Sequence, residues 1–230
     1  MVGRRFSLVC AMIVTASGLA AAQSTPAGAP VASPLFYYAG AAGRLTTDRD
    51  ALGGNPFASA LVEVLKDPDL TLARFGERLA ARTMVRSGGW QSPEVPRRTV
   101  DPGWRFAPDG QERRVALVLI NADYRKSGVP SLPGALFDSV RVTKALEETG
   151  FETRLVLDGN GEAVRRELDA FAARSLEADI AVIYAGGHGV QHKRIIYWIL
   201  GDYPDPRSSR ALASHAFALR DIGKAAKAGA

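Results

Sequence analysis

The segment Ile180–Gly189 constrains the fold more than any other part of the chain. It consists of a run of apolar residues that is closed by glycines around one histidine, His188. An uncharged run of this length, bounded by glycine, is typical of a strand buried on both faces. We expect the glycines to let the backbone turn sharply and approach a ligand closely. An imidazole at that point could act as a general base or activate a nucleophile.

The second half of the chain alternates predicted strands with predicted helices. Such alternation predicts an α/β fold in which a parallel sheet is covered by helices on both faces, giving three layers. Ligands of such sheets bind beyond the carboxyl ends of the strands, where we expect His188, Asp123 and Tyr124. The expected strands are Val115–Asn121, Phe151–Leu157, Ile180–Ala185 and Ile195–Leu200, and the expected helices are Gly134–Thr149, 161–175 and 211–228.

The first residues have the pattern of a secretory signal. Arg4 and Arg5 precede an apolar stretch, and the small residues Ala20–Ala22 follow it. We therefore predict a signal peptide over 1–22, cleavage near Ala22, and export to the periplasm or the extracellular space. The alternative is an uncleaved membrane anchor, but the apolar stretch is short for a bilayer span. After cleavage we expect no stable membrane anchor.

Cleavage would also remove Cys10, the one cysteine of the chain. The mature protein would then contain neither a disulfide nor a cysteine nucleophile. Loss of the two leader arginines lowers the formal charge from +5 to +3, and the remaining basic residues are scattered along the chain. We therefore expect no nucleic-acid partner.

The rest of the chain divides into a flexible leader over 23–34, a first module over 35–90, a proline-rich linker over 91–112 and a second module over 113–230. The first module contains a short strand at Leu35–Ala39 and two helices. One opens with Asn55 as cap and Pro56 at its first position, and the other runs from about Thr71 to a stop at Ser87-Gly88-Gly89.

The residues themselves leave other sites open. His192 could pair with His188 around a metal only if a helix brought both rings to one face, which the glycines disfavour, so no metal is expected. No nucleotide fingerprint is present, so we expect no cofactor. Asp138 lies early in a helix, where a carboxylate is either favoured by the helix dipole or available to hold a cationic group. His215 supports no site.

Four segments of the second module resemble the caspase and metacaspase-like cysteine peptidases. Arg114–Tyr124 looks like the opening strand and the Asn-x-x-Tyr loop of that family. Leu132–Asp138 resembles its Leu-x-Gly-x-x-x-Asp helix start, Tyr184–Gln191 is similar to its Tyr-x-Gly-His-Gly-x-Gln segment, and Ile196–Tyr203 matches the following strand. The resemblance implies the caspase-like fold over about 113–229.

The resemblance also implies roles for individual residues. His188 would be the catalytic imidazole, and the backbone N–H of Gly189 would stabilise an oxyanion. Asp138 would be a candidate for the pocket that reads a basic residue before the scissile bond. A protein or peptide substrate is expected.

The first module resembles the family's small subunit, in the segments Phe36–Gly43, Asp48–Leu61 and Ser87–Pro93. Its position ahead of the second module would make the chain a circular permutation, which a fold with neighbouring termini tolerates. The family's nucleophilic cysteine ends a strand that would follow residue 230, so we expect a truncated chain with a central strand missing and apolar edges unpaired. Ser139 and Ser214 do not lie at a strand end and do not replace the cysteine.

The sequence thus predicts a caspase-like cysteine endopeptidase by resemblance, inactive as given because no nucleophile remains. The first alternative is a catalytically dead pseudoenzyme that binds peptides or a protein partner. The second is an unrelated doubly wound domain for a small ligand.

Overall fold

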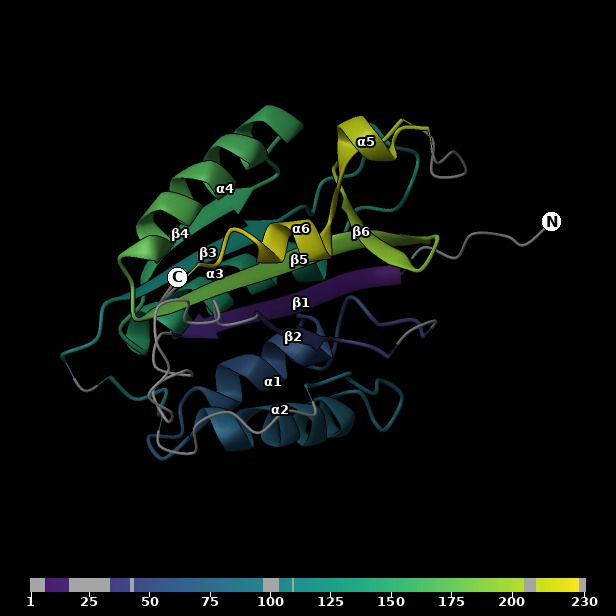
Figure 1. Ribbon diagram of the computed structural model, residues 1–230. Coiled ribbons are helices and arrows are strands. Elements are labelled where there is room, and N and C mark those ends of the chain that lie inside the picture. Colours follow the sequence, from purple (N-terminus) through teal and green to yellow (C-terminus); the bar gives the residue numbers. More distant parts are fainter. Residues whose placement is uncertain are drawn as a thin grey trace.

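A seven-stranded sheet lies at the centre of the computed structural model, with helices on both faces (Figure 1). The structure describes residues 7–16, 34–41, 44–96, 104–108, 110–204 and 210–227. The strand order is β2-β1-β5-β3-β4, and β6 pairs with β5 and β7 with β6. The strands are β1 (Ser7–Ala16), β2 (Leu35–Tyr38), β3 (Arg114–Ile120), β4 (Glu152–Leu157), β5 (Ile180–His192), β6 (Ile195–Ile199) and β7 (Ala216–Ala218).

The sheet is mixed, which corrects the prediction of a parallel sheet. Only β5, β3 and β4 run parallel, and they are the strands joined by helical crossovers. The pairs that involve β1, β2, β6 and β7 are antiparallel. The antiparallel pairing of β5 with β6 has a local cause, which is the two-residue hairpin turn between them. Lys193 and Arg194 form this turn, and both have positive φ, at 48° and 64°.

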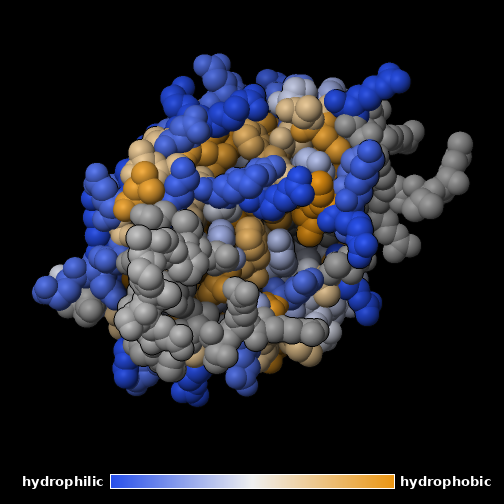
Figure 2. Space-filling model, in the orientation of Figure 1, coloured by the Kyte–Doolittle hydropathy of each residue, from blue (hydrophilic) through white to orange (hydrophobic). Residues whose placement is uncertain are grey.

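Helices cover both faces of the sheet, as predicted. One core cluster packs α1 (Pro56–Val64), α2 (Leu72–Arg86) and α3 (Pro133–Glu148) on one face. The other packs α4 (Gly161–Leu176) and α6 (Leu219–Gly223) on the opposite face. On the face turned toward the viewer, hydrophilic residues spread around the outline and hydrophobic ones show between them (Figure 2). The caspase-like three-layer arrangement is therefore confirmed.

The helix starts that the sequence predicted are confirmed where the signal is local. The side chain of Asn55 accepts a hydrogen bond from Phe57 N at 2.8 Å, and Pro56 occupies the first turn of α1. Thr71 precedes α2 and Ser87 ends it. No described helix has the length and apolar character that a membrane span requires.

The predicted final helix over 211–228 is wrong. The described part of that range forms a short α5 (Leu212–His215), the strand β7 and then α6. Phe217 lies opposite Trp198 of β6. Pairing with β6 therefore overrides the helical tendency of this alanine-rich segment, as tertiary contacts commonly do.

Ser7–Ala16 forms the strand β1, between β2 and β5 (Figure 1). The expectation that the edge of the sheet beside the histidine strand lacks a partner is therefore wrong for the described residues. The prediction of a signal peptide concerns processing and stays a prediction. An apolar run after two arginines fits either the core of a signal or a buried strand, so the sequence alone did not distinguish them. Residues 23–33 of the predicted flexible leader lie outside the described residues.

Arg114 anchors the described end of the proline-rich crossing to the second module. Its side chain is 2% exposed and donates hydrogen bonds to the carbonyl oxygens of Phe106, at 2.5 Å, and Thr149, at 3.1 Å. Further bonds reach Glu112 and two more carbonyls of the 104–108 segment. A guanidinium suits this position because it can serve several acceptors in one plane.

We expect Arg114→Met to lower the free energy of unfolding by about 3 kcal/mol, because it leaves several buried acceptors without a donor. Arg113→Ala is the matched control. Its side chain is largely exposed and pairs only with exposed Glu177, so it should cost less than about 1 kcal/mol. Urea unfolding of the three proteins measures the difference, and equal losses in the two variants would contradict the anchoring role.

Candidate functional site

His188 lies on β5, just beyond the point where the neighbouring parallel strand β3 ends. Ile120, the last residue of β3, is opposite Gly186 of β5, so His188 lies two residues beyond the end of β3. The loop that follows β3 brings Tyr124 and Pro130 to this edge. The predicted position beyond the carboxyl end of β3 is therefore confirmed, whereas the prediction that His188 follows the end of its own strand is wrong.

The expected sharp turn at the glycines is wrong, because β5 continues without interruption to His192. Gly187 has φ +152°, and a Cβ there would lie 2.5 Å from Trp198 Nε1 and 2.6 Å from the Tyr124 hydroxyl. The glycine thus serves close packing: any side chain at this position would collide with the residues that support His188.

Tyr124 fixes the backbone and the ring of His188. The N–H of His188 donates to the Tyr124 hydroxyl at 2.8 Å, and that hydroxyl donates to Ile199 O at 2.9 Å. The two rings meet edge to face with their centroids 4.7 Å apart. One tyrosine therefore connects the loop after β3, the histidine strand and β6.

The tautomer of His188 follows from its second contact. Nε2 lies 2.8 Å from Pro130 O, and a carbonyl oxygen can only accept, so Nε2 carries the hydrogen. The neutral ring then has its lone pair on Nδ1, which is the basic atom. His188 as a whole residue is 8% exposed, and its Nδ1 atom is buried.

Burial lowers the pKa of the His188 imidazole below its ordinary value of 6.5. The hydrogen bond to Pro130 O and the charge of Asp48 act in the opposite direction and are outweighed. His188 is therefore neutral at pH 7, which is the form that a general base requires.

Asp48 joins the first module to the second beside the site. Its two carboxylate oxygens accept the N–H groups of Gly134 at 2.9 Å and Ala135 at 3.1 Å, at the start of α3. A carboxylate at a helix N-terminus satisfies free N–H donors and complements the helix dipole. Nothing in the residues around Asp48 indicates a partner 86 residues away.

Asp138 is buried at 1% exposure and uses both carboxylate oxygens inside the protein. Oδ2 accepts from Asn55 N at 2.9 Å, and Oδ1 accepts from Arg141 Nη2 at 2.8 Å. Burial raises the pKa of this carboxyl to about 7, against the opposing effect of Arg141 and the Asn55 N–H. In this arrangement Asp138 connects α3 to the start of α1, and its predicted contact with a basic substrate residue stays a prediction.

Gly189 lies inside the sheet. It is opposite Ser7 of β1 on one side and Trp198 of β6 on the other. Its predicted role as an oxyanion donor needs an N–H that a substrate can reach, and that role also stays a prediction.

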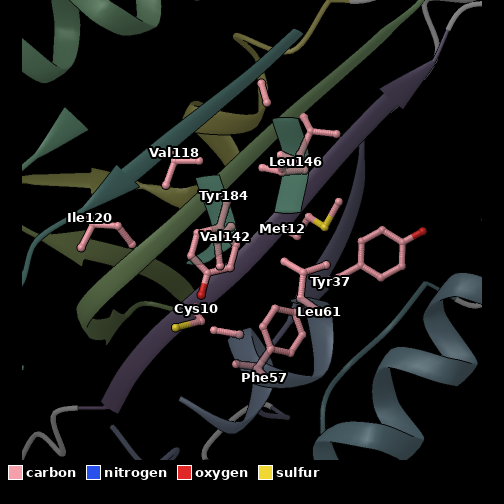
Figure 3. Packing of buried hydrophobic residues seen from close by; sticks show 14 of the residues in the cluster. Cys10, Met12, Tyr37, Phe57, Leu61, Val118, Ile120, Val142, Leu146 and Tyr184 are labelled. Carbon is pink, nitrogen blue, oxygen red and sulfur yellow. The ribbon is translucent and has the colours of Figure 1, made fainter. Parts of the chain in front are cut away.

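Cys10 lies on β1 directly opposite Gly186, two residue pairs away from the Leu8–His188 pair. It is 3% exposed, beside the Tyr184 hydroxyl in the core cluster (Figure 3). Burial raises the pKa of the Cys10 thiol well above its usual range. The thiol is therefore protonated and is a poor nucleophile, although it shares the sheet with His188.

The other candidates do not join the site. His188 and His192 lie four residues apart on one strand, which separates them by about 13 Å. The described residues contain no group of three or more histidines, cysteines or carboxylates that could hold a metal ion. His215 pairs with Asp202 at 3.3 Å. Ser139 is buried and donates to Leu136 O at 2.7 Å, and Ser214 lies within the four-residue helix α5.

Comparison with protein families gives one match. Residues 113–208 match the family model of the caspase domain, which spans β3 through β6 and includes His188. This part of the chain is therefore similar to the caspase domain. Searches of curated proteins and of solved structures each returned no match. The match stops short of the first module, so the resemblance of 35–90 to a small subunit stays a prediction.

The lowered pKa of His188 predicts a pH dependence of stability. The unfolded chain binds a proton near pH 6.5, and the folded chain binds it only at lower pH, so folding stability falls as the pH drops through 6.5. His188→Gln should lack this component when urea midpoints are compared between pH 5 and 7. A His188 imidazole that titrates at or above 6.5 by NMR would contradict the burial effect.

The burial of Cys10 predicts a protected thiol. We expect iodoacetamide to modify Cys10 in the folded full-length chain at least 100-fold more slowly than in urea, because the thiol is both inaccessible and protonated. Mass spectrometry of the intact protein follows the modification. Equal rates in the two conditions would mean that β1 does not hold Cys10 in the sheet.

Proposed function

We propose that this chain carries the histidine half of a caspase-like cysteine endopeptidase and is inactive by itself. The match of residues 113–208 to the caspase domain supports the peptidase class. The observation that carries the catalytic proposal is the fixed tautomer of His188, with Nε2–H bonded to Pro130 O and the lone pair on Nδ1. Two points support the proposed inactivity: Cys10 is buried and protonated in the full-length chain, and cleavage near Ala22 would remove it.

His188 could take part in peptide-bond hydrolysis if a thiol other than the buried Cys10 were placed next to it. The sulfur would attack the carbonyl carbon of the peptide while its proton passed to Nδ1 of His188. His188 would then give that proton to the leaving amine. Gly189 would contribute an N–H to the oxyanion if the edge of β5 beside it were open.

The proposed preference for basic residues rests on Asp138. Arg141 already neutralises this carboxylate at 2.8 Å. A substrate guanidinium could reach Asp138 only if it took the place of Arg141. A substrate arginine could compete with Arg141 for Asp138, because both guanidinium groups offer the same planar set of N–H donors.

The second candidate function is a pseudoenzyme that binds a peptide or a protein partner. The completeness of the described sheet favours it over an unfolded remnant, since β1 closes the gap beside β5 and two continuous cores result. A folded domain with a histidine site and no usable thiol can retain binding after it has lost chemistry.

We also propose that the protein is exported and that its leader is cleaved near Ala22, on the pattern of Arg4, Arg5 and the small residues that end at Ala22. Sequencing the N-terminus of the protein from its native host tests this. A chain that begins at Met1 would contradict it.

The activity test compares the full-length protein with His188→Ala and Cys10→Ser, using fluorogenic peptides with arginine or lysine at the cleavage site. We expect no hydrolysis above that of the His188→Ala control. Turnover that disappears in both variants would overturn the proposed inactivity and identify Cys10 as the nucleophile. Turnover that disappears only in His188→Ala would point to a nucleophile other than the thiol. Circular dichroism confirms that each variant is folded.

A further inference from the structure

β1 occupies a position that is closed by strands on both sides. Its ten residues pair with β5 from Ser7 opposite Gly189 to Ala16 opposite Ile180, and four of them also pair with β2. Figure 1 shows β1 as a long strand that crosses the molecule between these two neighbours. An extended segment of about this length is therefore required to join β2 to the rest of the sheet.

The position accepts only uncharged side chains. Cys10, Met12 and Val14 belong to the core cluster beneath α1 and α3, and Ala11 and Ile13 belong to the cluster on the opposite face. These five side chains are at most 3% exposed. A charge at any of them would lose its hydration without gaining a partner.

The same segment is the apolar centre of the predicted export signal. Cleavage near Ala22 would cut the chain between β1 and β2, so that pairing and packing alone would hold β1 in place. Its loss would expose the edge of β5 over Ile180–Gly189 and the facing edge of β2. Unpaired apolar edges of this kind are templates for another strand.

We propose that the position between β5 and β2 is a strand-binding site for an uncharged, apolar, extended peptide, with residues 7–16 as its resident occupant. Cleavage of the leader makes this occupant exchangeable with the same segment supplied in trans. Backbone hydrogen bonds to β5 and β2 supply the affinity, and the two rows of buried side chains supply the selectivity. In the native protein this exchange rests on the proposed cleavage of the leader, and it is independent of peptidase activity.

The strand that occupies the site lies directly beside His188. The residue opposite His188 in this register is Leu8 of the occupant. Exchange of the occupant therefore changes the strand that lies next to His188. The imidazole signals of His188 provide a readout of the site that needs no catalysis.

The first experiment tests whether residues 7–16 occupy the site in the full-length chain. Ala11 and Ala185 are directly opposite, so Ala11→Cys with Ala185→Cys, in a Cys10→Ser background, should form a disulfide in high yield on mild oxidation. Ala11→Cys with Ile183→Cys is the control, because these positions are diagonal and too far apart. Absence of the first disulfide, or equal yields in the two pairs, overturns the proposal.

The second experiment tests exchange. A specific protease site is placed within residues 24–32, between β1 and β2, and the folded protein is cut. A fluorescent peptide with the sequence of residues 7–16, carrying Cys10→Ser and Ala11→Cys, is then captured by Ala185→Cys in the cut protein, which also carries Cys10→Ser. We expect the same peptide with Ile13→Asp to be captured at least about 30-fold less efficiently, because its carboxylate would be buried.

Three outcomes of the exchange decide the proposal. Selective capture of the apolar peptide, with a shift of the His188 signals, supports it. A cut protein that stays folded but takes up neither peptide, or both equally, overturns it. If the cut protein unfolds when the leader segment leaves, refolding with the apolar peptide must restore the near-UV circular dichroism, and failure to do so overturns it as well.

Discussion

The parallel pairing of β5 with β3 is the constraint on which the site depends. It places Gly186 opposite Ile120, so His188 projects beyond the end of β3 toward the loop that carries Tyr124 and Pro130. Side chains alternate between the two faces of a strand, so a shift by one residue would turn His188 to the face covered by α4 and α6. The histidine is therefore positioned by backbone register first and by its own hydrogen bonds second.

The packing around β5 explains why the segment has so many glycines. Trp198 donates to Gly186 O at 3.0 Å, and the Tyr124 hydroxyl lies against the Gly187 backbone. Two large aromatic residues can approach one strand this closely only where that strand has no side chains. The sequence predicts a close approach to a ligand at these glycines, and in the structure the groups that approach Gly186 and Gly187 belong to the protein itself.

The parts of the fold that the sequence predicts correctly are those in which signal and structure lie close together. The cap at Asn55, the start of α2 after Thr71 and the strands β3, β4 and β5 all follow from short patterns. Contacts across more than 80 residues do not, and they include Asp48 with Gly134 and Asp138 with Asn55. The segment 7–16 is a third case, because its apolar pattern fits both the core of an export signal and a buried strand. The pairing with β5 and β2 that makes it a strand is not visible in the sequence.

The contacts between the two modules would hold the protein together if the chain were cut between them. Asp48 closes the start of α3, Asp138 holds the start of α1, and residues of α1, α2 and α3 share one core cluster. A single peptide-bond break between Pro96 and Trp104 would therefore leave two fragments that stay associated through buried surface. The assembled pair would migrate as one species under native conditions and as two bands once it is denatured.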